Sequence, residues 1–266
     1  MLAADRRRII LEEVTARGSV RVIDLAADLG VSEMTIRRDL DRLADAGELA
    51  KVHGGAVLSN SGAGRGVEPL SAQKAVRDTA EKRAIAAVAA GLVDEGMTVA
   101  VGAGTTTLEL ARLLRGRRVS VVTNSISIFH VLTDPDEAAA DPTSASAVQL
   151  TGGQRTPSDA LVGPVANAML ERVRCDVALL GCHGIDPGAG FTSPNIGEAE
   201  TNRRLIGSAR STVLLADHTK YGEIGAHLFA RFADVDALIV DDGLGRTARD
   251  SLASAVPLTI AEGVAR

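Results

Sequence analysis

The sequence predicts an α/β domain with a mostly parallel sheet, preceded by a small winged helix-turn-helix domain. Three observations predict this architecture. Two amphipathic helical segments between residues 22 and 43 meet at Gly30, and a short hairpin pattern follows them. A Ser/Gly-rich stretch without apolar periodicity comes next. From Met97 onward, short β-branched runs alternate with helical segments, which is typical of parallel strands covered by helices.

Composition places the chain among globular proteins. It has 266 residues, of which 45% are apolar and 24% charged, with a net charge of −5. Each apolar run is interrupted well before the roughly twenty residues that a membrane span needs, and Asp5 and Arg6 stand where a secretion signal would be apolar. We therefore expect a cytoplasmic protein without membrane contact. Cys175 and Cys182 lack metal-ligand spacing, so we expect reduced thiols, no metal and no cofactor.

Three helices and a hairpin are predicted in residues 1–57. The first helix, residues 5–17, packs behind two helices that join at Gly30. Ser32 stands at the N-cap position of the third helix, which ends near Gly47. The apolar stripes of the second and third helices are formed by Val22, Leu25, Ala26 and Leu29, and by Ile36, Leu40 and Leu43.

The outward face of the third helix is polar and basic, as in a helix that enters a DNA major groove. Residues 48–57 predict a β-hairpin, or wing, that reaches a phosphate or a minor groove. Nine Lys or Arg stand against ten Asp or Glu up to Asn60, so attraction to DNA must come from the grouping of the arginines. The alternative is a helix-turn-helix used only for packing. The predicted contacts with a double-stranded DNA operator are Ser32, Met34, Thr35, Arg37, Arg38, Arg42, Lys51 and His53.

Residues 58–70 read as a linker, and residues 71–266 as a second, larger domain. This domain opens with an Ala-rich helix, residues 71–94, with Ile85, Val88, Ala89 and Leu92 on one face. Residues 134–147 read as a surface insertion. Helices are predicted up to Leu114, up to Leu132 and across 165–173, and strands at residues 97–102, 119–124, 148–153, 177–181, 211–217 and 236–242.

Ligands of such sheets bind beyond the carboxyl ends of the strands. The first strand ends in a Gly-rich turn that opens a helix, which is typical of an anion site and suits a phosphate. A single Gly-rich turn or polar strand end is often purely structural. Several of them at one edge of the same sheet favour a binding site. The predicted contacts with a phosphorylated sugar are Gly104, Thr105, Thr106, Thr107, Thr123, Asn124, Ser125, Gly152, Gly153, Arg155, Glu198 and Lys220.

Two sets of motifs resemble the DeoR-type bacterial regulators. TIRRDLDRLADAGELAKVHGGA resembles their winged-helix motif, while GAGTTT, EAETNRRLI and LLADHTKYG resemble their effector domain. The resemblance implies a ribose-5-phosphate-isomerase-like fold, with phosphate at residues 104–107 and the sugar near Thr123, Asn124, Gly152, Gly153 and Lys220. One departure is Gly102, where such proteins often have an acidic residue.

Three functions remain open at this point. The first is a repressor of a sugar-metabolism operon, acting as a dimer or tetramer and modulated by a phosphorylated sugar. The second is a sugar-phosphate isomerase-like enzyme with Glu198 or Glu200 as its base, although residues 181–186 lack most of the carboxylates of the isomerase. The third is a DNA reader joined to a pure oligomerisation module. We favour the repressor and expect no enzymatic activity.

Overall fold

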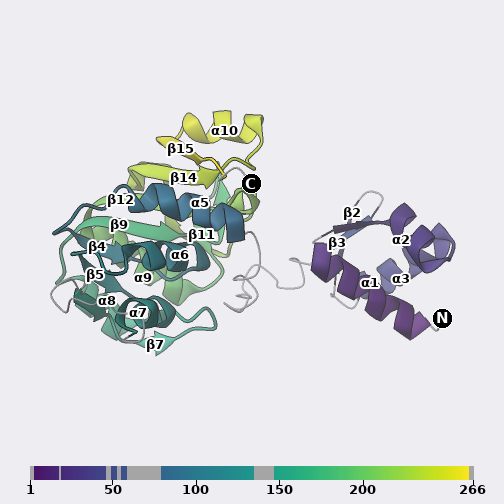
Figure 1. Cartoon of the computed structure of the whole chain (residues 1–266), viewed down its shortest axis with the longest axis horizontal. Coiled ribbons are helices and arrows are strands. Elements are labelled where there is room, and N and C mark those ends of the chain that lie inside the picture. Colours follow the sequence, from purple (N-terminus) through teal and green to yellow (C-terminus); the bar gives the residue numbers. More distant parts are fainter. Residues whose placement is uncertain are drawn as a thin grey trace. The chain divides into compact units, whose positions relative to one another are not determined.

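The computed structural model describes residues 3–17, 19–45, 49–52, 55–58, 79–134 and 147–263. The chain divides into two compact units, Met1–Gly64 and Arg65–Arg266 (Figure 1). The interior of the predicted linker, the first part of the predicted Ala-rich helix and the interior of the predicted insertion lie outside the described residues.

The first unit has the predicted winged helix-turn-helix fold. Its helices and strands are α1 Ala3–Arg17, β1 Ser19–Arg21, α2 Val22–Leu29, α3 Glu33–Asp45, β2 Leu49–Val52 and β3 Gly55–Leu58. The strands form an antiparallel sheet of order β1-β3-β2, in which β2 and β3 are the predicted hairpin. Strand β1 was not predicted, because three residues are too few to show an alternating pattern.

The predicted apolar stripes form the core of this unit. Gly30 adopts a φ of 62°, a left-handed conformation that glycine takes without strain, and the chain reverses there between α2 and α3. The amide of Thr35 donates to the hydroxyl of Ser32 at 3.3 Å, which confirms the predicted N-cap. Around this turn, the buried core consists of Ile10, Val14, Val20, Val22, Leu25, Ile36, Leu40, Leu43, Leu49 and Ala56.

The second unit is built on a seven-stranded sheet of order β15-β14-β12-β9-β4-β5-β6, in which every neighbouring pair is parallel. From β4 the chain builds outward through β5 and β6, and it returns at β9 to build the other half. The carboxyl ends of β4 and β9 therefore form a topological switch point, where such sheets bind ligands. The strands are β4 Thr98–Val101, β5 Ser120–Thr123, β6 Ala147–Leu150, β9 Cys175–Gly181, β12 Ala209–Ala216, β14 Ala237–Asp241 and β15 Leu258–Ala261.

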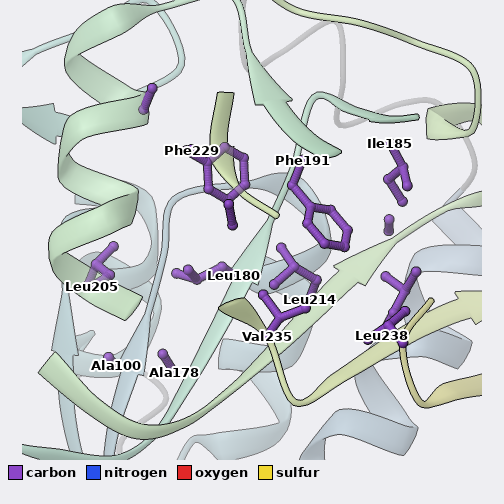
Figure 2. Packing of buried hydrophobic residues seen from close by; sticks show 14 of the residues in the cluster. Ala100, Ala178, Leu180, Ile185, Phe191, Leu205, Leu214, Phe229, Val235 and Leu238 are labelled. Atoms are coloured by element: carbon purple, nitrogen blue, oxygen red, sulfur yellow. The ribbon is translucent and has the colours of Figure 1, made fainter. Parts of the chain in front are cut away.

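Helices cover both faces of the sheet, as predicted (Figure 1). One face buries Val99, Val101 and Leu179 against α5 Thr79–Ala90, α6 Thr105–Leu114 and α7 Ile126–Thr133. The other face packs against α8 Pro164–Leu170, α9 Ile196–Ser208 and α10 Arg246–Ala253. Figure 2 shows this second core, in which Phe191 and Phe229 lie above the sheet residues Leu180 and Leu214.

Several short elements were not predicted. They are β7 Gln154–Arg155, β8 Leu161–Val162, β10 Gly184–Asp186, β11 Gly190–Ser193, η3 His218–Lys220, β13 His227–Ala230, η4 Phe232–Asp234 and, at the end of the chain, α10 and β15. Strands β10, β11 and β13 form a small antiparallel sheet. One expectation was wrong: α5 ends at Ala90, so Leu92 lies beyond the helix and is exposed. Among the described residues, no helix combines the length and apolarity needed to cross a bilayer.

Candidate functional site

The predicted DNA-contacting face of α3 is open to solvent. Met34 is 56% exposed, and Arg37, Arg38 and Arg42 are exposed as well. Ser32 caps the helix, and its hydroxyl lies 2.9 Å from that of Thr35. These side chains therefore occupy an exposed surface that runs from the start of α3 to Arg42 in its last turn, as a recognition helix requires.

The arginines on this surface differ in their partners. Arg37 forms an ion pair with Glu33 one turn earlier, with 2.8 Å between Nη2 and Oε2. Within the described residues, no hydrogen bond or ion pair engages the side chains of Arg38 and Arg42. Two unengaged guanidinium groups on an exposed helix are available for base edges or phosphates. For the wing, only the backbone of Lys51 is described, in β2, and His53 lies outside the described residues.

One residue of this unit that sequence analysis did not single out is Asp39. It sits between the exposed Arg38 and the core residue Leu40, yet only 4% of it is exposed. Its Oδ2 lies 2.5 Å from Nε of Arg6, which joins α3 to α1. Helical spacing alone could have indicated its position, because Asp39 shares a face with Ile36 and Leu43.

In the second unit, the clearest candidate binding feature is the start of α6, beyond the carboxyl end of β4. The N-cap residue Gly104 is exposed and provides no side-chain hydrogen bond to the first turn. By contrast, Ser125 caps α7 and Asn195 caps α9 with side-chain oxygens. The first amides of α6 thus remain without a side-chain acceptor at the positive end of the helix, which favours an anion.

The predicted residues of this turn have different environments. Thr107 is fully buried, and its hydroxyl donates to the carbonyl of Gly104 at 3.0 Å. Thr106 is also buried, whereas Thr105 keeps some exposure. Gly104 and Thr105 are therefore the members of the turn that present backbone and side chain to solvent. Gly102 packs so closely on Leu180 that an added Cβ would lie 2.5 Å from Cδ2 of that side chain, so an acidic residue there would require Leu180 to move.

Thr123, Asn124 and Ser125 are buried beside this turn and support it. Asn124 accepts from the amide of Ala103 at 3.0 Å and donates to the carbonyl of Leu161 at 3.2 Å. Thr123 donates to the carbonyl of Val101, and Ser125 accepts from the amide of Ile128. Their polar atoms thus hold the Gly-rich turn and the start of α7 in place.

Gly152, Gly153 and Arg155 follow the neighbouring strand β6. The two glycines have φ values of 71° and 121°, and a Cβ on Gly153 would lie 2.5 Å from the carbonyl oxygen of Val162. Glycine is therefore required at this close approach. Arg155 extends into solvent and forms an ion pair with Asp159 at 2.5 Å.

Glu198, in the first turn of α9, accepts hydrogen bonds from several hydroxyl groups. Thr156 donates to its Oε1 at 2.9 Å, Ser158 donates to the same oxygen, and Ser193 donates to Oε2 at 3.5 Å. This network joins α9 to the segment that follows β7. Glu200, the other candidate base of the isomerase alternative, pairs with Arg203.

Lys220 lies in η3, beyond the carboxyl end of β12. Its charge acts on Cys182, which follows β9. The pKa of the Cys182 thiol is raised to about 12, and burial is the largest cause. The charge of Lys220 acts in the opposite direction, and that of Asp217 adds to the increase. The ends of β9 and β12 thus bring a lysine close to the switch point. Within the described part of the chain, no group of three His, Cys, Asp or Glu side chains could hold a metal ion.

Sequence analysis also missed the carboxylate of Asp241, which is 1% exposed at the end of β14. It accepts from the amide of His218 at 2.6 Å and lies 2.7 Å from Nδ1 of the same residue. The preceding apolar run indicated only a strand, so nothing in the pattern distinguished this carboxylate from an exposed one.

Comparison with known proteins agrees with this architecture. Residues 6–62 match the family model of the DeoR-like helix-turn-helix domain, and residues 77–242 match that of the DeoR C terminal sensor domain. The chain is 38% identical over 268 residues to the HTH-type transcriptional regulator GlpR of Haloferax volcanii, covering 100% of both chains. It is 34% identical to the lactose phosphotransferase system repressor of Staphylococcus aureus, over 87% of this chain and 89% of the relative.

Among solved structures, the ribose 5-phosphate isomerase A of Methanocaldococcus jannaschii is similar over 53% of each chain, with 18% identity and a TM-score of 0.37. The strand order of the sheet and the two family matches define the fold class. The curated relatives are named as a regulator and a repressor, which favours a binding protein over the isomerase-like enzyme. Both units match, and the chain belongs to the DeoR family of helix-turn-helix transcriptional regulators.

Proposed function

We propose that this chain is a repressor of sugar-metabolism genes and that a phosphorylated sugar modulates its affinity for operator DNA. The observation that carries the proposal is the start of α6. Its first amides lack a side-chain cap at Gly104, and they lie at the switch point of a parallel sheet. A dianionic phosphate is a suitable acceptor for such amides. The name of the S. aureus relative, which pairs lactose with a phosphotransferase system, supports the same ligand class.

The proposed roles of the predicted site residues follow from their environments. Gly104 and Thr105 contact the phosphate through backbone and hydroxyl groups, and Lys220 provides a positive charge on the other side of the switch point. Gly152 and Gly153 allow the backbone to approach the ligand closely.

Arg155 and Glu198 contact the sugar only after rearrangement, because each already has partners. The remaining residues, Thr106, Thr107, Thr123, Asn124 and Ser125, keep these contacts in position.

We call Met1–Gly64 the DNA unit and Arg65–Arg266 the sensor unit. In the DNA unit, we propose that α3 enters the major groove and that Arg38 and Arg42 contact base edges or phosphates. A homodimer or tetramer would present two such helices to a palindromic or repeated operator. The ligand can act only if it binds two arrangements of the reader units with unequal affinity. A shift from almost fully bound to almost fully released DNA requires about 5.5 kcal/mol of difference, summed over the ligands bound.

The test is a thermal-shift screen of the full-length chain against inorganic phosphate, glycerol 3-phosphate, ribose 5-phosphate, glucose 6-phosphate and fructose 6-phosphate. We expect at least one sugar phosphate to stabilise the protein, by about 2.7 kcal/mol at a hundredfold excess over its dissociation constant. That sugar phosphate should also change the affinity for the chain's own promoter DNA. A protein that binds the DNA but is stabilised by no sugar phosphate would instead be a reader joined to an oligomerisation module.

A further inference from the structure

Asp241 holds the imidazole of His218 at the carboxyl edge of the sheet. Strands β12 and β14 are adjacent, with Ala216 paired to Val240, so the residues that follow them meet. Oδ1 of Asp241 accepts from the amide of His218 at 2.6 Å, and Oδ2 accepts from the amide of Gly243 at 2.9 Å. The ring nitrogen Nδ1 lies 2.7 Å from the same Oδ2. One buried carboxylate therefore binds the backbone and the ring of one histidine.

The ring is also confined by Gly243. A Cβ at that position would lie 2.5 Å from Nδ1 and 2.9 Å from Cε1 of His218. The imidazole thus packs directly on the glycine backbone, and any side chain there would displace it. The same ring is not fully covered, because the side chain of His218 is 35% exposed.

These contacts determine which nitrogen of a neutral His218 carries the proton. Backbone amides can only donate, so both oxygens of Asp241 act as acceptors toward His218 and Gly243. Nδ1 then donates to the carboxylate, and Nε2 of the neutral ring is an acceptor. Within the described residues, no hydrogen bond engages Nε2. Nε2 is therefore a hydrogen-bond acceptor on a ring that Asp241 and Gly243 fix in orientation. The ring is partly exposed to solvent and lies two residues before Lys220.

We propose that His218 is a further contact residue of the effector site, accepting a hydrogen bond from a ligand hydroxyl through Nε2. The inference rests on the proposed function and specifies the ligand end that lies away from the phosphate. Strand β12 is two positions from β4 in the sheet, about 10 Å at the usual strand spacing. An extended five- or six-carbon sugar phosphate is of comparable length. A ligand with phosphate at α6 can thus place a hydroxyl at His218.

The charged neighbours of His218 are consistent with a polar but uncharged ligand group at Nε2. Asp241 faces the ring from β14, and Asp217 lies at the end of β12, where it accepts from the amide of Thr219 at 3.2 Å. Both carboxylates disfavour a further anion close to the ring. Lys220 provides the positive charge on the β9 side, as its effect on Cys182 shows. A hydroxyl donor satisfies Nε2 without adding a charge to this cluster.

Two substitutions of His218 separate its proposed contact with the ligand from its hydrogen bond to Asp241. In His218→Asn, the amide nitrogen lies near the position of Nδ1 and can still donate to Asp241, but nothing replaces Nε2. In His218→Gln, the longer amide reaches the position of Nε2 but loses the donor to Asp241. His130→Asn, at an exposed histidine of α7, is the matched control. Calorimetric titration of each full-length variant would use the sugar phosphate that stabilises the wild type most, and inorganic phosphate alone.

We expect His218→Asn to weaken sugar-phosphate binding at least tenfold, His218→Gln to retain more of it, and inorganic phosphate to bind all variants alike. Equal sugar-phosphate binding by His218→Asn and the wild type, or weaker binding only in His218→Gln, would overturn the role of Nε2. Nitrogen-15 spectra at about pH 8.5, where an ordinary imidazole is neutral, should show the proton of His218 on Nδ1. A proton on Nε2 would overturn the inference as well. A wild type that binds no sugar phosphate would remove the proposed function, and this inference with it.

Discussion

Nε of Arg6 lies 2.5 Å from Oδ2 of Asp39, and this contact joins α1 to α3, the helix that we propose enters the major groove. The two side chains are 12% and 5% exposed, so removing one partner leaves the other charge almost buried. Such a loss typically costs about 3–5 kcal/mol, whereas replacing both partners by apolar residues can be neutral.

We therefore predict that Asp39→Ala destabilises the DNA unit by about 3 kcal/mol and that Arg6→Met with Asp39→Leu recovers much of this loss. Urea unfolding of the full-length single and double variants measures both values. Operator affinity should fall with the single change, because α3 loses its ion pair with α1 and keeps only the apolar contacts of the core. An unchanged urea midpoint in Asp39→Ala would show that the pair contributes little to stability.

Arg38 and Arg37 provide a second prediction, because they are adjacent on α3 and differ in their partners. Arg37 pairs with Glu33, whereas no described residue engages the Arg38 side chain. If Arg38 contacts a base edge, Arg38→Ala should cost about 1–3 kcal/mol of operator affinity and relax sequence preference. Gel-shift series with operator and mutated operators measure this effect. Arg118→Ala, an exposed arginine of the sensor unit, is the control, and an equal loss for all DNA sequences would assign Arg38 to phosphate contact instead.

The third prediction concerns alkaline pH. Burial raises the pKa of Cys182 to about 12 in the folded protein, above the roughly 8.5 of an unfolded thiol. Its contribution to stability is therefore complete below about pH 8.5 and declines as the pH rises toward 12, because the unfolded chain loses this proton first. Between about pH 8 and 10, the free energy of unfolding should fall less steeply in Cys182→Ala than in the wild type. Urea titrations at several pH values test this, and identical slopes would contradict it.

The elements that the sequence predicted are those with a strong repeat. The stripes of α2 and α3 recur at helical spacing, and the central strands β4, β9 and β12 are continuous apolar runs because helices cover both their faces. Strands β10, β11 and β13 were missed because they are too short to show an alternating pattern, and β13 is held by pairing with β11, which is distant in the sequence.

The site was predictable only in part for a related reason. Polar residues that follow strands could be placed at one edge of the sheet, but the pattern could not separate residues that face a ligand from those that support the turn. Asn124 is an example, since its amide binds the backbone of Ala103 and Leu161. Asp241 shows the same limit, because its partner His218 is supplied by another element. For Asp39, helical spacing indicates the inward position but not the partner, Arg6 of another helix.

The fourth prediction tests the remaining enzymatic alternative. An isomerase needs a carboxylate that is available as a base, but Glu198 already accepts from Thr156 and Ser158. We expect the purified chain to show no isomerisation of ribose 5-phosphate in a coupled assay, and Glu198→Gln to leave that background unchanged. Turnover that disappears in Glu198→Gln or Glu200→Gln would show that the chain is an enzyme.

The last prediction concerns Gly104, where a carboxylate should compete with the ligand for the first amides of α6. Its φ of 160° and ψ of 161° are extended and open to any residue, and an added Cβ would lie 3.1 Å from Oγ1 of Thr107, which a small adjustment relieves. Gly104→Asp places an acceptor at an N-cap position, and because glycine is itself tolerated there, the helix should gain only about 0.3 kcal/mol.

The same carboxylate repels a phosphate, so Gly104→Asp should respond to no sugar phosphate while still binding operator in its absence. Gly104→Ala is the matched control, because it adds the Cβ without the charge and should keep most of the response. Thermal shift and DNA-release assays on both variants measure the difference. An aspartate variant that responds as well as the alanine variant would place the phosphate elsewhere on the sheet edge, because a charge at the N-cap would weaken any anion bound by those amides.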